Sequence, residues 1–375
     1  MRIAIFHDFF PAIGGGERTV LALARAWRAP VYTTDIHRPS IERLGYGDVN
    51  LISLGDIIPQ APLRQIHASI RFALANVDAD VYVLSGNWPI YAARRHHPNL
   101  EYCYTPARGF YDLRDAIIRR QPTMVHRAGV WSWSALHGAA DRVAWTNVDR
   151  VVAISENIRR RIKTFLGRDS SVVYPPTDVA RYRFETVGDF WLSVNRLYPE
   201  KRLEIQYEAF RRLPNERLVV VGGYAHADHA EKYFRRLHPP PNVEFRGEID
   251  ERELIHLYAQ CRGLVCTAID EDFGLTPVEA MASGKCVLAT NEGGYRETIR
   301  EGRTGFLLPP DAEAFAAKIR SLGDDLLRSM KDDCLDRARA FDESIFVEKM
   351  RGLIEGAPSH SAGPVHPEVA DTVKG

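Results

Sequence analysis

Short runs of β-branched and aromatic residues alternate with segments of helical periodicity along almost the whole chain. Strands that alternate with helices are typical of βαβ units, in which crossover helices join parallel strands. The pattern therefore predicts an α/β fold built from open, doubly wound parallel sheets. The predicted strands lie at 3–10, 30–34, 81–85, 102–105, 151–155 and 172–174 in the first half, and at 190–194, 218–222, 243–247, 264–267, 286–290 and 306–308 in the second.

A proline-containing segment separates the two series of strands. Pro175 and Pro176 end the preceding strand, and a polar stretch follows them. A chain of 375 residues is long enough for two ordinary domains. Ligands of open α/β sheets bind at the carboxyl ends of the strands, so two facing sheets would share one cleft. We expect two Rossmann-like domains at 1–180 and 181–356, and a disordered tail at 357–375.

Charge and cysteine content narrow the class of protein. Lys and Arg total 49, and Asp and Glu also total 49, so no net field attracts nucleic acid. Five scattered cysteines predict a reducing compartment rather than a disulfide framework. The N-terminus becomes polar too early for a signal peptide, and no run of about 18 apolar residues offers a membrane span. We therefore expect a cytoplasmic protein, at most peripheral on the cytoplasmic face of a membrane.

The most informative motif follows the strand at 264–267. It places Glu271 in a strand-end loop and Glu279 eight residues later. Thr276 and Glu279 have the spacing of a capping box, and Pro277 suits the first helical position, so we expect a helix to start at Thr276. The N-terminus of that helix would present N–H groups and a partial positive charge to a phosphate. From spacing alone, Glu279 could equally be only a cap, and Glu271 a solvated loop acid.

Other strand ends carry further candidate site residues. Arg196 and Lys201 follow the first strand of the second half, where two fixed cations could stabilise an anionic leaving group or simply be solvated. The glycines in 11–18 allow the backbone to approach a ligand closely, although the spacing matches neither G-x-G-x-x-G nor a Walker loop. Tyr104 and Arg108 lie just after another strand of the first half.

Together these motifs resemble those of the family-four retaining glycosyltransferases, which have the GT-B fold. Glu271 and Glu279, around Asp-Phe-Gly-Leu-Thr-Pro, are similar to the E-x7-E motif of that family. In the family the first glutamate contacts the donor sugar and the second holds the ribose hydroxyls. The family also has an Arg and Lys pair that neutralises the leaving diphosphate. The resemblance therefore implies three catalytic residues, Arg196, Lys201 and Glu271.

The resemblance also implies binding residues around the cleft. Tyr104 stands where the family usually has a histidine, which leaves open whether it contacts the donor sugar. Arg108 could hold an acceptor phosphate or be an ordinary surface arginine. The backbone amides of 273–276 would face the donor phosphates. The implied donor-binding residues are Gly15, Gly16, Asn195, Gly223, Phe273, Gly274, Leu275, Thr276 and Glu279.

The resemblance implies a reaction as well. It implies an acceptor-binding first domain, a nucleotide-sugar-binding second domain, and retaining transfer of a hexose that forms an α linkage without a metal ion. The motifs look most similar to those of mannosyltransferases that assemble surface polysaccharides and lipid-linked glycans. GDP-mannose is the first expected donor and UDP-glucose the second, with a glycan or lipid-linked acceptor. A sugar-nucleotide epimerase and a catalytically inactive glycan-binding protein remain alternatives, because both can share the architecture.

Three further segments have open interpretations. The acids of 270–272 have the D-x-D form that can bind a metal ion, although they precede a predicted helix in the second domain. The segment 226–229 could ligate zinc, but it lacks a fourth ligand, and a polar loop beside the nucleotide is the simpler interpretation. The segment 114–145 mixes arginines and tryptophans, which suits either contact with anionic lipid or buried tryptophans beneath a basic helix.

Overall fold

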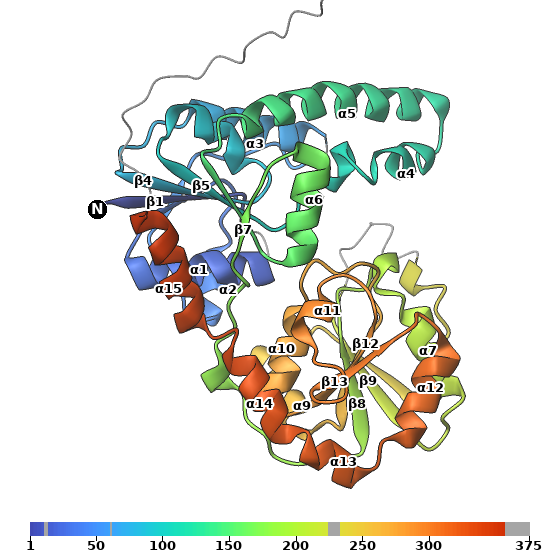
Figure 1. The fold of residues 1–375 in the computed structure, drawn as a ribbon. Helices are drawn as coiled ribbons and strands as arrows, with labels where there is room; N and C mark the ends of the chain where they lie inside the picture. The colour runs from blue at the N-terminus through green and yellow to red at the C-terminus, as the bar shows by residue number, and fades with distance from the viewer. Residues whose placement is uncertain (11–13, 61, 224–232, 357–375) are drawn as a thin grey trace, which may run out of the picture.

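The computed structural model describes residues 1–10, 14–60, 62–223 and 233–356. In these residues the chain forms two parallel sheets in two lobes, one above the other in Figure 1, with helices against each sheet. The predicted α/β architecture of two doubly wound sheets is therefore confirmed.

The first sheet has seven strands among the described residues, in the order β3-β2-β1-β4-β5-β6-β7, and every pairing is parallel. The order reverses between β1 and β4, which is where α/β sheets usually bind ligands. The strands are β1 (Ile3–His7), β2 (Val31–Thr33), β3 (Leu51–Ser53), β4 (Val81–Ser85), β5 (Asn99–Cys103), β6 (Arg150–Ala153) and β7 (Ser171–Val172).

The second sheet has six strands in the described part of the chain, in the order β10-β9-β8-β11-β12-β13, again all parallel. Its order reverses between β8 and β11. The strands are β8 (Phe190–Val194), β9 (Arg217–Val221), β10 (Val243–Gly247), β11 (Gly263–Cys266), β12 (Cys286–Thr290) and β13 (Gly305–Leu308).

Helices connect the strands and cover the sheets. The first lobe contains α1 (Gly15–Trp27), α2 (Arg38–Arg43), α3 (Leu63–Leu74), α4 (Arg114–Arg119), α5 (Met124–Trp145), α6 (Glu156–Leu166), η1 (Pro89–Arg95) and η2 (Arg108–Phe110). The remainder of the chain contains η3 (Val179–Arg181), η4 (Pro199–Lys201), α7 (Leu203–Arg211), α9 (Glu251–Gln260), α10 (Leu275–Ala282), α11 (Tyr295–Thr298), α12 (Ala312–Ser321), α13 (Asp324–Ser329), α14 (Lys331–Arg339) and α15 (Glu343–Glu355).

All twelve predicted strands coincide with observed ones to within a few residues. The sequence analysis missed β3, because Leu51–Ser53 is only three residues long and lacks the clear apolar run of the other strands. The predicted helix start was also wrong: α10 begins at Leu275, and Gly274 is its N-cap residue with a φ of 93°.

The chain crosses between the two lobes twice, and the two crossings lie side by side. Thr177 donates its N–H to the carbonyl of Phe341 at 2.9 Å, and Thr177 pairs with Asp342. After the second crossing, α15 packs on the first lobe, where Arg150 Nη1 donates to the carbonyl of Leu353 at 2.7 Å (Figure 1). The division of the chain at residue 180 stays a prediction, and the return of α15 is a feature that it does not include. The predicted tail lies outside the described residues.

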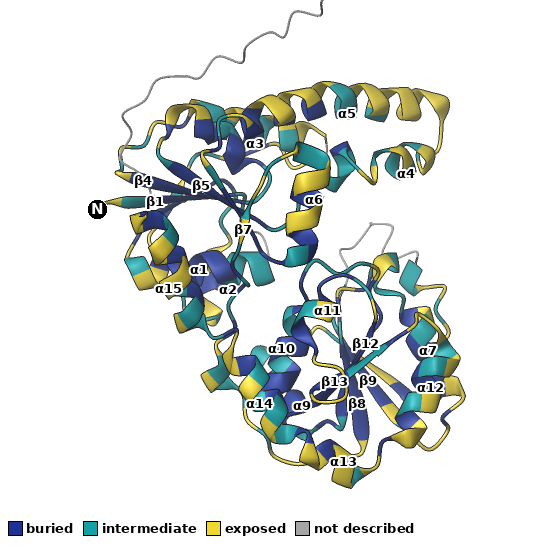
Figure 2. Cartoon of the chain, viewed as in Figure 1, coloured by how far each residue is buried: buried dark blue, intermediate teal, exposed yellow. Residues whose placement is uncertain are grey.

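Each sheet is buried under its helices, while the solvent side of the helices is exposed (Figure 2). The core includes Trp191, Tyr102 and Phe72, all fully buried. A parallel sheet covered on both faces explains why its strands read as continuous apolar runs rather than as alternating ones. Among the described residues no helix is both long and apolar enough to cross a membrane.

Candidate active site

Lys201 and Glu271 meet at the carboxyl edge of the second sheet. Lys201 follows β8 and Glu271 follows β11, which are neighbouring strands at the point where the strand order reverses. The Nζ atom of Lys201 lies 2.6 Å from Oε2 of Glu271, and each side chain is about one-fifth exposed. The predicted cation and the predicted sugar-contacting acid are therefore adjacent. One ligand that carries a sugar on a phosphate could touch both.

Close backbone packing holds the loop of Glu271 inside the second domain. The N–H of Gly294 donates to the carbonyl of Glu271 at 2.7 Å. A Cβ atom on Gly293 would lie 2.4 Å from that carbonyl oxygen, so only glycine allows this approach. Asp270, next to Glu271, has a φ of 44°, a left-handed conformation that Asp adopts more readily than most residues.

Glu279 lies deeper in the second domain than its predicted capping position, and its hydrogen-bond partner is a different residue. Tyr258 donates its hydroxyl to Oε2 of Glu279 at 2.8 Å, and burial raises the pKa of Glu279. The predicted capping box with Thr276 is wrong, because the N-cap residue is Gly274 and no side chain caps the helix. Glu279 instead lines a small cavity between the domains, with Arg18 and other residues of both lobes.

The N-terminus of α10 faces the glycine loop of the first domain. A Cβ atom on Gly15 would lie 2.4 Å from Cδ1 of Leu275, so a larger residue there would collide with the second domain. Phe273 is buried and stacks on Tyr174, with ring centroids 5.4 Å apart. The side chain of Phe273 is therefore part of the core, and the contact of its backbone with a donor phosphate stays a prediction. The start of the predicted glycine segment, at 11–13, lies outside the described residues.

The loop after β8 carries Arg196 as an exposed side chain. Its guanidinium lies 5.9 Å from the ring centroid of Tyr198. Burial raises the pKa of Glu17 on α1, and the charge of Arg196 opposes that rise, so Arg196 acts electrostatically across the domain boundary. Asn195 donates to Ser193 Oγ at 2.7 Å, and the carbonyl of Gly223 accepts from the loop at 2.9 Å. Asn195 and Gly223 thus fix the loop that presents Arg196.

Tyr104 and Arg108 both have partners within the first domain. Tyr104 donates its hydroxyl to the carbonyl of Gly16 at 2.8 Å and accepts from Ser85 Oγ at 3.1 Å. Tyr104 therefore ties the end of β5 to the glycine loop. Arg108 forms an ion pair with Asp112 at 2.6 Å. The structure brings Tyr104 close to Gly16, while the roles of both residues toward a ligand stay predictions.

The sequence analysis missed an acidic cavity beside Tyr104. The cavity has a volume of about 120 Å³ and is lined by Asp8, Glu17, Gly86 and Tyr104, among others. Asp8 accepts backbone N–H groups of the loop after β4, at 2.8 and 2.9 Å, yet burial raises its pKa to about 7. The sequence signal for this cavity was Asp8, an acid directly after the first apolar strand, which lies where the strand order of the sheet reverses.

The D-x-D acids of 270–272 bind an arginine. Nη1 of Arg161 lies 2.5 Å from Asp272, and Nη2 lies 2.7 Å from Asp270. Within the described ranges, no three His, Cys, Asp or Glu residues are grouped as a metal site would need. The other metal candidate, 226–229, lies outside those ranges.

The tryptophans of the segment 114–145 differ in exposure. Trp145 is buried, Trp133 is half-buried and Trp131 is exposed. The first half of α5 extends from the body of the lobe and exposes most of its side chains (Figure 2). Over the whole length of α5, the exposed large apolar residues are Met124, Val125, Trp131, Leu136 and Val143.

Comparisons with known proteins agree with this geometry. Residues 177–340 match the family described as glycosyl transferases group 1. The chain is 29% identical to alpha-1,3/1,6-mannosyltransferase ALG2 of Dictyostelium discoideum, over 92% of this chain and 95% of that protein. It is 28% identical to alpha-1,3/1,6-mannosyltransferase ALG2 of Homo sapiens, over 82% of this chain and 84% of that protein.

Solved structures share the architecture. The structure of Anabaena Alr3699/HepE in complex with UDP and glucose has a TM-score of 0.75, with 18% identity over 95% of this chain and 100% of that one. WaaG, a glycosyltransferase involved in lipopolysaccharide biosynthesis, has a TM-score of 0.68, with 17% identity over 95% and 100% of the two chains. With the two facing sheets, these matches show that the chain has the GT-B fold and that its residues 177–340 resemble the group 1 glycosyl transferases.

Proposed function

We propose that this enzyme transfers a mannosyl residue from GDP-mannose to a lipid-linked glycan, with retention and formation of an α linkage. The observation that carries the proposal is the contact between Lys201 and Glu271 at the cleft edge of the second domain. The ALG2 relatives support the sugar, because they are named as alpha-mannosyltransferases. A 168-residue match at 32% identity to the mouse enzyme named GDP-Man:Man(3)GlcNAc(2)-PP-Dol alpha-1,2-mannosyltransferase supports donor and acceptor. UDP-glucose is the second candidate donor, since HepE was solved with UDP and glucose.

In the proposed mechanism the second domain stabilises the charge that develops on the leaving diphosphate. Lys201 and Arg196 supply fixed positive charges, and the N-terminus of α10 supplies backbone N–H groups. Glu271, beside Lys201, would contact the sugar hydroxyls as the anomeric carbon becomes cationic. Glu279 would accept hydrogen bonds from the ribose. The leaving diphosphate itself would help to take the proton of the acceptor, which attacks from the same face, so no covalent carboxylate intermediate is needed.

The same arrangement supports a reaction without a divalent metal. Arg161 binds both Asp270 and Asp272, so both carboxylates that would form a D-x-D metal site already have a cationic partner. Lys201 and Arg196 would then carry the charge compensation that a metal provides elsewhere. Activity in excess chelator tests this point: we expect full turnover, and a loss of turnover that magnesium or manganese restores would contradict it.

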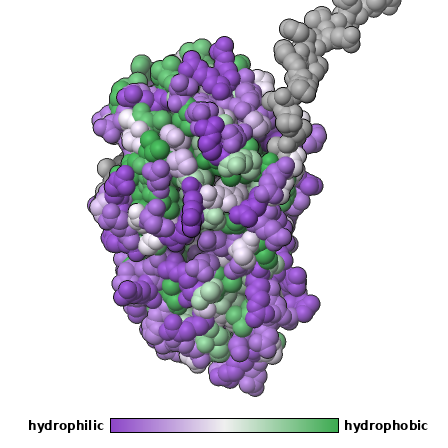
Figure 3. Space-filling view, turned by 90° about the vertical axis from the view of Figure 1, so that its left-hand side faces the viewer, coloured by the Kyte–Doolittle hydropathy of each residue, from purple (hydrophilic) through white to green (hydrophobic). Residues whose placement is uncertain are grey.

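An enzyme that uses a lipid-linked acceptor must reach a membrane. In the first domain, α3 and α5 form a protein surface suited to membrane binding. Ser69 on α3 and His137 on α5 are hydrogen-bonded at 3.0 Å, so the two helices lie together. Apolar side chains are prominent in the upper half of Figure 3, which is the first domain. The α3–α5 surface exposes Leu63, Ile66, Ile70 and Leu74 on α3 and Met124, Val125, Trp131, Leu136 and Val143 on α5, with Arg119, Arg120, Arg127 and Arg142 nearby in the chain. Exposed apolar residues with arginines suit peripheral binding to the cytoplasmic face of an anionic bilayer.

A donor panel tests the proposal. Purified full-length enzyme is incubated with GDP-mannose, UDP-glucose and related donors, with and without membrane lipid extract, and release of nucleoside diphosphate is measured. We expect release from GDP-mannose that increases with the lipid extract. Conversion of the donor without an acceptor would instead indicate an epimerase. Binding without any turnover would indicate an inactive glycan-binding protein.

A further inference from the structure

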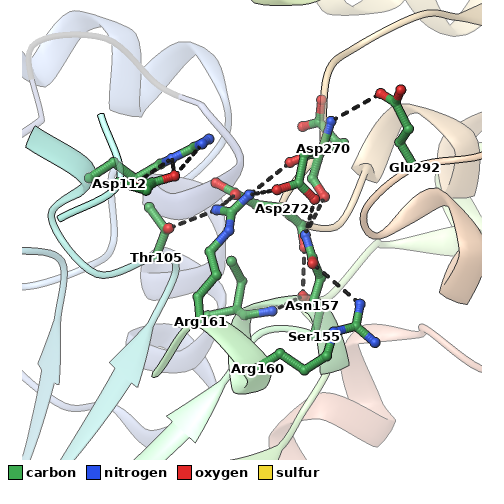
Figure 4. Close-up of polar contacts among 12 residues, drawn as sticks. Thr105, Asp112, Ser155, Asn157, Arg160, Arg161, Asp270, Asp272 and Glu292 are labelled. Carbon is green, nitrogen blue, oxygen red and sulfur yellow. Dashed lines mark hydrogen bonds and ion pairs between the residues drawn. The ribbon is translucent and has the colours of Figure 1, made fainter. Parts of the chain in front are cut away.

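Side chains at the start of α6, in the first domain, form hydrogen bonds to the loop that carries Glu271 in the second domain. Three successive backbone carbonyls of this loop accept hydrogen bonds from side chains at 155–161 (Figure 4). Ser155 Oγ donates to the carbonyl of Asp272 at 2.6 Å, and Asn157 Nδ2 donates to the carbonyl of Glu271 at 3.2 Å. Arg161 Nη2 donates to the carbonyl of Asp270 at 2.9 Å.

Arg161 is the centre of this contact. Its side chain is only 8% exposed, and it points at the carboxylates of both Asp270 and Asp272 (Figure 4). Nη1 also donates to Thr105 Oγ1 at 3.0 Å, at the end of β5. Without the arginine, Asp270 and Asp272 would lose the cation that pairs with both of them. Removing a buried guanidinium costs more than removing one partner of an exposed ion pair, because charges are left unpaired.

A second contact fixes α6 itself to the second domain. Both oxygens of Glu297, on α11, accept backbone N–H groups of the first turn of α6, from Glu156 at 2.7 Å and from Asn157 at 2.8 Å. A carboxylate at a helix N-terminus is favoured by the helix dipole. The second domain therefore also binds the end of α6 whose side chains hold the Glu271 loop.

The loop needs such support because its backbone conformation is unusual. Asp270 has a φ of 44°, which costs energy for a residue other than glycine and persists only where the surroundings fix it. Gly293 and Gly294 hold one side of the loop, and α6 holds the other. Between them, the side chain of Glu271 reaches Lys201 at 2.6 Å.

We propose that Arg161, with Ser155 and Asn157, is a positioning group that holds the side of the Glu271 loop facing the first domain, and that it does so only while the two domains are in contact. Closure of the domains would then set the glutamate against the donor sugar, so that transfer takes place only in the closed enzyme. The part of this inference that concerns transfer rests on the proposed function. The part that concerns the loop does not.

Hydrogen exchange in the full-length protein, with no donor present, tests the loop. In Arg161→Gln we expect the amides of 268–273 to exchange about fivefold faster or more, because the loop loses its partner from the first domain. Arg159→Gln is the matched control: Arg159 lies on the same helix, is half-exposed, and pairs with Glu156 on its own helix. Unchanged exchange in Arg161→Gln would overturn the proposal.

Kinetics separate positioning from general structural support. We expect Arg161→Gln to lower kcat about tenfold or more and to leave the affinity for bare GDP within about twofold, because GDP lacks the mannosyl group that Glu271 would contact. Arg161→Lys should recover part of the loss, since it keeps the charge but cannot donate to both carboxylates. An equal loss of kcat and GDP affinity would overturn the proposal.

A third variant covers the case in which Arg161→Gln does not fold. Asn157→Ala removes the bonds to Asp270 and to the carbonyl of Glu271 without unpairing a charge, and it should show the same two changes at smaller size. Wild-type enzyme that turns over no donor would count against the proposed function alone. The exchange measurement would then still decide whether α6 holds the loop.

Discussion

The two sheets of this enzyme have the same strand order and present different surfaces. Numbered within its own domain, each sheet runs third, second, first, fourth, fifth, sixth, and the first sheet adds a seventh strand at its edge. In the second domain, α10 is largely buried, with Pro277, Val278 and Met281 inside the core. In the first domain, α5 is 22 residues long and exposes most of its N-terminal half. The shared topology therefore places the strand-end loops, and the helix surfaces decide what each domain can bind.

The difference separates two tasks. The second domain gathers Lys201, Glu271 and Glu279 at the cleft, where charge and burial would act on the proposed nucleotide-sugar donor. The first domain contributes glycines at the cleft and an apolar α3–α5 surface on its outside. Variants in the second domain should accordingly change turnover, whereas variants on the α3–α5 surface should change where the enzyme binds.

The largest expected effect is the loss of the two cations. We predict that Arg196→Ala and Lys201→Ala each lower kcat by roughly a hundredfold or more, because each removes charge stabilisation from the leaving diphosphate. Saturating GDP-mannose and measurement of product nucleotide give kcat directly. Arg211→Ala, an exposed arginine on α7 that pairs with Glu208, should stay at wild-type turnover. Near-wild-type kcat in both site variants would show that these two cations of the second domain do not stabilise the leaving group.

The two glutamates should differ from each other. Glu271→Gln should lower kcat by tens of fold and leave binding of bare GDP little changed, because that ligand lacks the transferred mannosyl group. Glu279→Ala should weaken GDP binding and lower stability by about 1–3 kcal/mol, since the hydroxyl of Tyr258 loses its buried acceptor. Calorimetric titration and thermal unfolding measure the two effects. Equal loss of GDP affinity in both variants would show that the glutamates do not divide the work.

The stability part of this prediction also shows where sequence reasoning failed. Thr276 and Glu279 have the spacing of a capping box, but Gly274 starts the helix and Glu279 turns to Tyr258, 21 residues earlier in the chain. A local pattern cannot reveal a partner that a different element supplies. The apolar runs, by contrast, located the strands well, because burial on both faces of a parallel sheet requires long apolar segments.

The contacts between the domains were beyond the sequence for the same reason. Arg161 reads as one of several arginines on an amphipathic helix, and nothing near it in sequence marks it as different. Its partners Asp270 and Asp272 are more than 100 residues away, and they read as a metal motif. The E-x7-E spacing identified the loop, whereas the side chains that hold it depend on how two separately folded domains meet.

The next largest effect should appear on the α3–α5 surface. Leu136→Glu combined with Val143→Glu should lower binding to anionic vesicles about tenfold, because both side chains are exposed and would otherwise insert among lipids. Turnover with a soluble acceptor should not change. The matched control is Leu326→Glu, an exposed leucine in the second domain that should leave vesicle binding as it is. Equal vesicle binding by all the proteins in a sedimentation assay would remove the membrane role from this surface.

The smallest effect is a pH dependence of stability to which two buried acids of the first domain contribute. Burial raises the pKa of Asp8 to about 7 and that of Asp141 to about 6, from an ordinary value of 3.8. Because the folded state binds these protons more tightly than the unfolded state, their contribution is fully present below pH 3.8 and is lost as pH rises toward 7. By contrast, the pKa of the exposed Asp48 is lowered.

We therefore predict that the melting temperature falls by a few degrees between pH 5 and pH 8, which corresponds to about 1–2 kcal/mol. Asp8→Asn should flatten this slope whatever its effect on the absolute melting temperature, because the amide has no proton to lose in that range. Asp48→Asn should keep the wild-type slope, because the hydrogen bond from Arg25 lowers the pKa of the Asp48 carboxyl. Scanning calorimetry across the pH range measures all three proteins. A wild-type slope in Asp8→Asn would mean that other groups set the pH dependence, and the acidic cavity of the first domain would then have no special part in it.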